Sequence, residues 1–191
     1  MKKVIIVHGW GGHPKEGWFP WLKKELEAKG IEVLIPKLPD TENPRIQNWV
    51  PALSDAVGVP DGETYFVGHS LGCQTIARYI ETLPYELKIG GAVFVAGFFK
   101  RLTGLESEEQ ETARLWLETP IDLEKVKSHL PKSIAIFSDD DPFVPLDNVA
   151  DFKDRLGSEI ITIPKAGHIN AGSNYFKLPE ALKALESMFS S

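Results

Sequence analysis

The sequence predicts an α/β fold with a mainly parallel sheet, and three observations support this prediction. Short apolar runs alternate with amphipathic segments along the 191 residues. The run at residues 4–7 is continuous and β-branched, which is typical of a strand that helices cover on both faces. Near the C-terminus a helical spacing recurs at Leu178, Leu182, Leu185 and Phe189. Strands that alternate with helices indicate an α/β architecture.

The first half of the chain is expected to hold three strands and three helices. Apolar runs place the strands at 4–7, 31–35 and 64–67. Apolar residues at helical spacing place the helices at 18–29, 46–57 and 71–83. Gly30 provides a C-terminal stop for the first helix, and Pro36 closes the second strand.

The second half continues the alternation with one interruption. Strands are expected at 89–96, 133–137 and 159–163, and helices at 148–156 and 178–189. Residues 98–127 contain an acidic run and Trp116 but no strand-like run, so we expect a short helical insertion there, with its acidic side chains in solvent. No linker sets this stretch apart, and the chain is therefore expected to form a single domain over residues 1–191.

The composition excludes several classes of protein. Hydrophobic residues make up 42% and charged residues 25%, as in ordinary globular proteins. The net charge of −6 argues against a nucleic-acid partner, which favours clustered Lys and Arg. The four apolar residues at 4–7 are too few for a secretory signal, and no stretch of the sequence approaches the ~18 apolar residues of a membrane span. The single cysteine, Cys73, has no disulfide partner in the chain, so nothing indicates an oxidising compartment. We therefore expect a cytoplasmic protein without a membrane partner. The oligomeric state stays open.

The strongest local motif is at residues 68–72, where Gly-His-Ser-Leu-Gly matches the G-x-S-x-G pattern. It lies directly after an expected strand and directly before an expected helix, which is the context that this pattern requires. Gly68 and Gly72 lack the Cβ atoms that would clash in so sharp a turn. We therefore interpret Ser70 as a candidate nucleophile at the carboxyl end of its strand.

A serine nucleophile needs a base, because the free alcohol reacts poorly at neutral pH. His168 follows the last strand and reaches the same edge of the sheet as Ser70, which makes it the favoured base. His69 is next to the serine, but neighbouring side chains at a tight turn point in different directions. His13 and His129 are expected at the surface.

The base in turn needs an acid that orients its ring. Asp139, Asp140 and Asp141 follow the fifth strand at the same edge of the sheet. Asp141 is favoured because it stands four residues before Pro145, a position that the acid characteristically occupies in hydrolases of this architecture. Asp140 remains the main alternative, and the other two aspartates are expected to form turns or cap the sheet edge. The order Ser, Asp, His is the α/β-hydrolase order.

Backbone amides must also bind the charge that develops on the substrate oxygen. The amide of Leu71, directly after Ser70, is one expected donor, and the amide of Trp10, in the glycine-rich loop at residues 8–12, is the other. That loop lacks the Lys and Ser/Thr of a phosphate-binding P-loop. His8 is expected to hold the loop by hydrogen bonds, and Cys73 to be a small buried residue.

Four segments together, at residues 8–12, 68–72, 139–145 and 167–171, resemble the small α/β-hydrolases of the retinoblastoma-binding protein nine type. The resemblance covers essentially the whole chain, although Ser138 stands where the wider superfamily often has glycine. It implies a minimal α/β-hydrolase fold of about six mainly parallel strands, with helices on both faces and a very short cap. It also implies a triad of Ser70, Asp141 and His168, and no cofactor.

The function expected from these residues is a serine hydrolase that cleaves small carboxylic esters through an acyl-enzyme. Ester hydrolysis makes the least demand on protonation of the leaving group, which places carboxylesterase ahead of thioesterase, lipase or peptidase. The alternative is a catalytically silent hydrolase scaffold that binds other proteins. A metal hydrolase is disfavoured because no histidine pair has ligand spacing. The short chain predicts an open, shallow pocket, with four candidate lining residues: Phe98, Phe99, Trp116 and Phe143.

Overall fold

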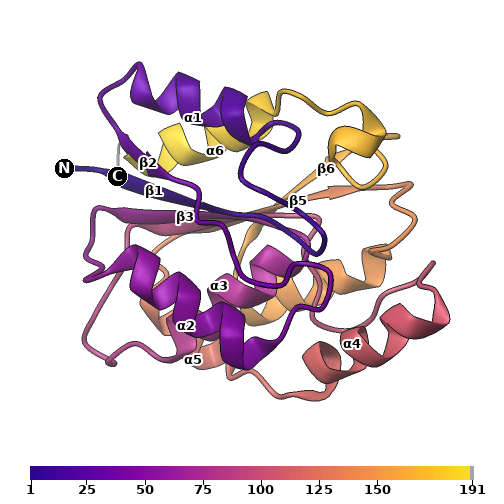
Figure 1. Ribbon diagram of the computed structural model, residues 1–191. Helices are drawn as coiled ribbons and strands as arrows, with labels where there is room; N and C mark the ends of the chain where they lie inside the picture. The colour runs from indigo at the N-terminus through magenta and orange to yellow at the C-terminus, as the bar shows by residue number, and fades with distance from the viewer. Residues whose placement is uncertain (190–191) are drawn as a thin grey trace.

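A six-stranded sheet runs through the centre of the computed structural model, which describes residues 1–189 (Figure 1). The strands are β1 (Lys3–Val7), β2 (Glu32–Leu34), β3 (Thr64–His69), β4 (Gly91–Val95), β5 (Ser133–Ser138) and β6 (Glu159–Ile163). Their order across the sheet is β2-β1-β3-β4-β5-β6, and every neighbouring pair is parallel. The predicted fold class, about six mainly parallel strands between helices, is therefore confirmed.

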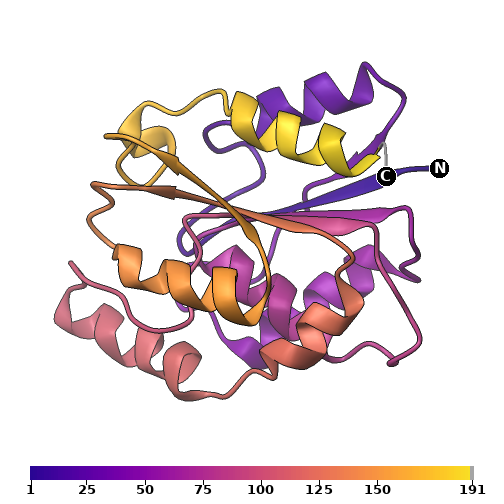
Figure 2. The ribbon, with the colours of Figure 1, turned by 180° about the vertical axis from the view of Figure 1, so that it is seen from behind.

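Helices cover both faces of this sheet. One face carries α1 (Phe19–Glu27) and α6 (Pro179–Phe189), which lie together in the views from the front and from behind (Figures 1 and 2). The other face carries α2 (Ile46–Val57), α3 (Leu71–Glu81) and α5 (Leu123–His129), while α4 (Ser107–Glu118) lies farther from the sheet. None of these helices in residues 1–189 is long and apolar enough to cross a membrane.

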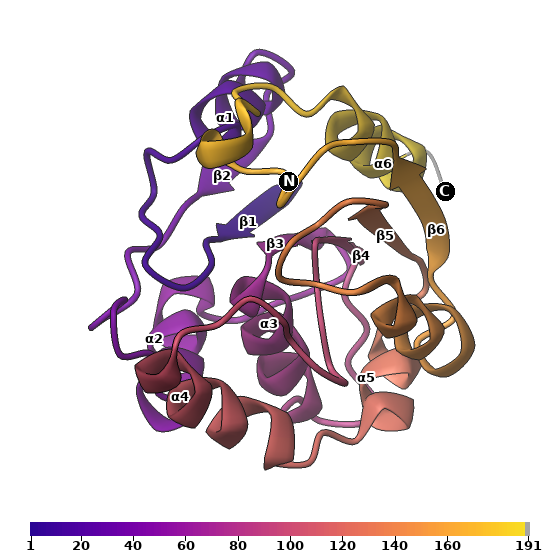
Figure 3. The same ribbon diagram turned by 90° about the vertical axis from the view of Figure 1, so that its right-hand side faces the viewer.

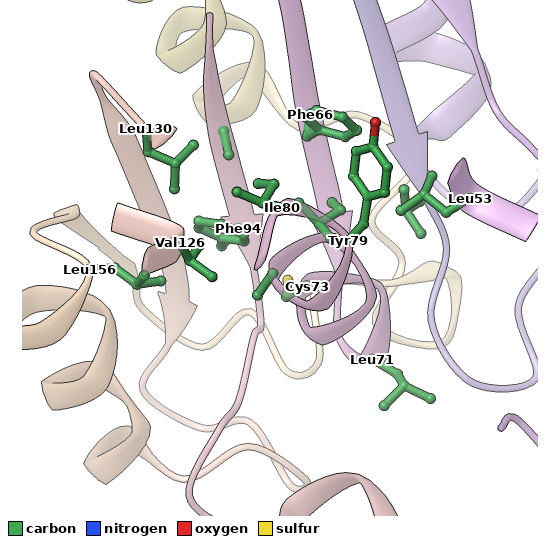
Figure 4. Close-up of a cluster of buried hydrophobic side chains, with 14 of the residues drawn as sticks. Leu53, Phe66, Leu71, Cys73, Tyr79, Ile80, Phe94, Val126, Leu130 and Leu156 are labelled. Atoms are coloured by element: carbon green, nitrogen blue, oxygen red, sulfur yellow. The ribbon is translucent and has the colours of Figure 1, made fainter. Parts of the chain in front are cut away.

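The core on the α3 side fixes the position of that helix under the middle of the sheet. Phe66 of β3 and Phe94 of β4 are fully buried and face α3, where Tyr79 and Ile80 contact the same cluster (Figure 4). Burial of one such side chain contributes about 1.5–3 kcal/mol relative to leaving it exposed. Because α3 is buried from Leu71 onward, its first turn cannot shift without disrupting this packing.

The loops that follow the strands gather at one edge of the sheet, on the right in Figure 1 and facing the viewer in Figure 3. Helix α4 lies at the same end. In open parallel sheets, ligands bind outside the carboxyl ends of the strands. The candidate residues of the sequence therefore meet where such a fold places its binding site.

The expected helix at residues 148–156 differs in form. The chain makes a 3₁₀ turn (Leu146–Asn148) and then a π-helical turn (Asp151–Arg155), which the Leu156 amide closes on the Asp151 carbonyl at 3.1 Å. The buried Asn148 side chain binds the backbone of residues 99–101, so this residue belongs to a turn. The wider turn that follows keeps Phe152 and Leu156 in the core.

His129 is buried, and the prediction that it lies at the surface is wrong. Its Nδ1 donates a hydrogen bond to the Leu87 carbonyl at 2.6 Å. Leu123 and Val126 precede it at steps of three residues, so the apolar face of α5 includes His129. That spacing was a signal in the sequence for its burial.

Candidate active site

Ser70 occupies the turn between β3 and α3 with φ of +52° and ψ of −121°. Such a conformation costs a non-glycine residue on the order of 1–3 kcal/mol. Neighbouring strands and helix hold it there: the Ser70 amide donates to the Val95 carbonyl at 2.9 Å, and the Ser70 carbonyl accepts from the Cys73 amide at 3.0 Å. The hydroxyl is thereby fixed at the carboxyl end of the central strand.

Two glycines make this turn possible, as the sequence predicts. A Cβ atom on Gly72 would lie 2.3 Å from the Val7 carbonyl oxygen, and one on Gly68 would lie 2.8 Å from the Cys73 amide nitrogen. Real Cβ atoms essentially never come so close to backbone atoms. The helix α3 can therefore approach β1 and β3 only with glycine at both positions.

The loop after β1 lies directly against Ser70. A Cβ on Gly9 would be 3.0 Å from the Ser70 Cβ, which shows how closely the two backbones approach. The amide of Gly11 donates to the Thr41 carbonyl at 2.8 Å and that of Gly12 to the Gly9 carbonyl at 3.1 Å. These bonds occupy the two amides that follow Trp10 in the chain. The Trp10 amide is therefore the loop's candidate for binding an oxyanion.

His8 holds this loop in the way that the sequence predicts. Its Nδ1 donates to the Gly9 carbonyl at 2.9 Å, and its Nε2 accepts from the Leu38 amide at 3.1 Å. Burial lowers the pKa of the His8 imidazole, which favours the neutral ring that these two bonds require. His8 is therefore a structural residue of the loop.

Asp141 and His168 face each other across the loops that follow β5 and β6. His168 Nδ1 lies 2.8 Å from Asp141 Oδ2, and the two side chains are 10% and 2% exposed. The other oxygen, Asp141 Oδ1, accepts from the amides of Phe143 and Val144 at 2.8 and 3.0 Å. The carboxylate is thus fixed by its own turn, and Nε2 of His168 remains for a group in the adjoining cavity.

The neighbouring aspartates have different partners. Asp139 Oδ1 accepts from the Lys165 amide and Asp140 Oδ1 from the Gly167 amide, both at 2.7 Å. The sequence left Asp140 open as an alternative acid, and in the structure its carboxylate accepts from the Gly167 amide, next to His168, and from the Ser138 hydroxyl. These contacts join loops about 26 residues apart in the chain, and no spacing in the sequence indicates them.

The His69 side chain is hydrogen-bonded to the backbone of His168. Its Nε2 donates to the His168 carbonyl at 2.9 Å, and the two ring centroids are 4.8 Å apart. Burial, with a smaller effect from the nearby His168, lowers the pKa of His69 to about 3. His69 therefore stays neutral at physiological pH, in the tautomer that keeps a proton on Nε2.

The depressed pKa of His69 predicts a loss of stability in acid. The folded pKa of about 3 lies below the usual value of 6.5, so the unfolded chain binds the extra proton between these two pH values. The contribution of the neutral His69 to the free energy of unfolding is fully present above about pH 6.5 and is lost as the pH falls toward 3. At pH 4.5 the loss is about 2–3 kcal/mol. His69→Gln keeps a donor for the His168 carbonyl but does not titrate. Its free energy of unfolding, measured in urea at pH 7.5 and 4.5, is expected to fall less than that of the wild type.

The exposed His13 provides the control for this prediction. His13→Gln should show the same acid dependence as the wild type. Equal losses in His69→Gln and the wild type would contradict the role given to His69.

Ser70 and His168 line one cavity of about 230 Å³. Phe98 and Phe143 form part of its apolar wall, as the sequence suggested, and the Phe143 ring meets the His168 imidazole edge to face with centroids 5.2 Å apart. The other two suggested residues, Phe99 and Trp116, line a separate cavity of about 210 Å³. The remaining wall includes Leu102, Leu105 and Glu109, so the segment before α4 and its first turn cover the site.

Cys73 lies close to Ser70 in the chain but is fully buried. Burial raises the pKa of its thiol, and Sγ lies 3.4 Å from the Val95 carbonyl. Because the thiolate is the reactive form of cysteine, this residue has the structural role that the sequence predicts.

Comparisons with known proteins cover nearly the full chain. A model of the serine hydrolase family matches residues 4–187. YdeN of Bacillus subtilis (strain 168), named as a proposed hydrolase, is 32% identical over 99% of this chain and 97% of its own length. Serine hydrolase RBBP9 of Rattus norvegicus is 28% identical over 96% and 95%, respectively. The crystal structure of the B. subtilis ydeN gene product superposes with a TM-score of 0.92 at 30% identity and covers both chains fully.

Proposed function

The chain belongs to the serine hydrolase family, and on that premise we propose that it cleaves small carboxylic esters through an acyl-enzyme on Ser70. The resemblance to the small hydrolases of the RBBP9 type is confirmed, and hydrolase activity is the activity of that family. One observation carries the finer proposal. Ser70 and His168 line the same cavity, while Asp141 lies 2.8 Å behind the imidazole.

In the first step, His168 Nε2 accepts the Ser70 hydroxyl proton as Oγ bonds to the carbonyl carbon of the ester. The carbonyl electron pair moves to oxygen, where the amides of Trp10 and Leu71 bind it. Leu71 is the first residue of α3, and the first amides of a helix have no acceptor within the helix. Each such donor contributes about 2.7–4 kcal/mol to the stability of the transition state.

The tetrahedral intermediate then collapses. Its C–O bond to the alcohol breaks, and the imidazolium returns the proton to the leaving oxygen. Water repeats the sequence on the acyl-enzyme, with His168 again as base, and the carboxylic acid leaves. Throughout, Asp141 accepts the hydrogen bond from Nδ1, and its negative charge stabilises the imidazolium. Two backbone amides hold the carboxylate in place for this role.

The cavity supports small acyl groups as substrates. Its volume of about 230 Å³ is below the 300–1,000 Å³ that is common for drug-sized ligands. Phe98 and Phe143 supply apolar contacts beside Ser70, while the segment 98–127 contributes only short walls. Acyl chains of a few carbons fit this space better than long fatty chains.

A graded substrate panel tests the proposal. We expect p-nitrophenyl acetate and butyrate to have a higher kcat/KM than the octanoate, the acetyl thioester and the acetyl anilide. The Ser70→Ala variant, purified in parallel, provides the blank. A preference for the octanoate would contradict the small acyl pocket, and a preference for the thioester or anilide would reassign the substrate class. Failure of every substrate would favour a silent scaffold.

A further inference from the structure

Four consecutive residues, the last of β5 and the three that follow it, contact four consecutive residues after β6. Three of these contacts run from a side-chain oxygen to a backbone amide: Asp139 Oδ1 to Lys165 at 2.7 Å, Ser138 Oγ to Ala166 at 3.0 Å and Asp140 Oδ1 to Gly167 at 2.7 Å. The fourth is the contact between Asp141 and the His168 ring. The segment that carries the candidate acid is thus paired, residue by residue, with the segment that carries the candidate base.

The segment held in this way has a strained backbone. Lys165, Gly167 and Ile169 have φ values of +52°, +55° and +50°. Every second residue from 165 to 169 therefore has a left-handed backbone conformation. For a β-branched residue such as Ile169 this conformation is a genuine outlier. At Lys165 and Ile169, which unlike Gly167 carry a Cβ, it costs on the order of 1–3 kcal/mol each. Such a loop keeps its shape only if surrounding contacts stabilise it.

Of the three contacts to backbone amides, that of Asp140 is the nearest to the base in the chain, because Gly167 immediately precedes His168. Its Oδ1 accepts a second hydrogen bond from the Ser138 hydroxyl at 2.7 Å, and the same hydroxyl oxygen accepts from the Ala166 amide. A hydrogen bond to a carboxylate is roughly twice as strong as a neutral one. Asp140 therefore joins two of the three amide contacts into one network.

We propose that Asp140 is a positioning residue that, through the Gly167 amide and Ser138, holds the strained loop so that the His168 imidazole meets Asp141 and Ser70. The effect on catalysis rests on the proposed function, whereas the effect on the imidazole does not. Asp140 is outside the set of residues that line the cavity, so it acts on turnover and leaves substrate binding unchanged.

The kinetic test compares Asp140→Ala with Asp140→Asn. The alanine removes the acceptor, and we expect kcat on p-nitrophenyl acetate to fall roughly 10–100-fold with KM within about threefold, because a displacement near 1 Å can cost 10²-fold. The asparagine keeps an oxygen at the same place and should stay within about threefold of the wild type in kcat. Ser138→Ala, expected to show a smaller loss of the same kind, serves if Asp140→Ala does not fold.

Asp61 provides a matched control. Its Oδ1 also accepts from one backbone amide, that of Glu63, and one hydroxyl, that of Thr64, both at 2.9 Å. It precedes β3 and therefore lies at the opposite end of the sheet. Asp61→Ala should lose stability without loss of kcat. An equal loss of kcat in Asp61→Ala and Asp140→Ala would overturn the proposal.

A second measurement does not depend on activity. The proton between His168 Nδ1 and Asp141 is expected as a downfield ¹H NMR resonance, assigned by its absence in His168→Ala. It should broaden or disappear in Asp140→Ala and persist in Asp61→Ala. If the wild type hydrolyses no ester but shows this pattern, the positioning role stands and the proposed function fails. An unchanged resonance in Asp140→Ala would overturn the positioning role, whatever the activity.

Discussion

Replacement of Ser70 by alanine is expected to lower kcat on p-nitrophenyl acetate by about 10⁴–10⁶-fold, since removal of a single triad member costs up to about 10⁶. The substitution deletes the atom that forms the acyl-enzyme, and the loop amides alone cannot replace it. Alanine keeps the Cβ of serine, so the backbone strain of the turn stays the same and the thermal midpoint should change little. Steady-state kinetics and a melting curve on the same preparation measure both quantities.

The exposed Ser54 on α2 provides the control for the effect of a serine-to-alanine substitution elsewhere in the protein. Ser54→Ala should retain the full activity of the wild type. If Ser70→Ala keeps more than a tenth of the wild-type activity, Ser70 is not the nucleophile.

Replacement of Asp141 by asparagine is expected to lower kcat by about 10⁴-fold, because it inverts the hydrogen bond to the base. The amide oxygen of asparagine can still accept from Phe143 and Val144, so its NH₂ group faces His168 Nδ1. Nδ1 must then be the unprotonated nitrogen, and Nε2, which carries the proton instead, cannot accept one from Ser70. Steady-state kinetics at saturating substrate measure the loss.

The neighbouring aspartates make this prediction specific. Asp139→Asn and Asp140→Asn retain an oxygen for the Lys165 and Gly167 amides, and their kcat should stay within about threefold of the wild type. All three variants change one carboxylate to an amide within three consecutive residues. Equal losses in the three would contradict the assignment of Asp141 as the acid.

The fold was predictable because its elements are marked by apolar periodicity. The strands at the centre of the sheet are buried on both faces, so β1 and β3 appear as short continuous apolar runs. The π-helical turn at Asp151–Arg155 was not predictable, because a helical pattern does not distinguish i+4 from i+5 hydrogen bonding. The burial of His129 was visible in its spacing from Leu123 and Val126, and its polar side chain masked that signal.

The candidate site was predictable where each residue follows its own strand. Ser70, Asp141 and His168 come after β3, β5 and β6, and the parallel sheet brings the carboxyl ends of these strands to one edge. The role of Asp140 was not predictable, because its partner is the backbone amide of Gly167, and amides are the same in every sequence. The contact of His69 with the His168 carbonyl was hidden for the same reason.

The central claim is that Ser70 is a nucleophile activated by His168, and covalent labelling tests it most directly. The purified protein is incubated with a fluorophosphonate probe beside a known serine hydrolase, and peptides are analysed by mass spectrometry. We predict one adduct, on the peptide that contains Ser70, with loss of labelling in His168→Ala and in Ser70→Ala. A wild-type protein that stays unlabelled while the reference enzyme reacts, or an adduct at another residue, would contradict the claim.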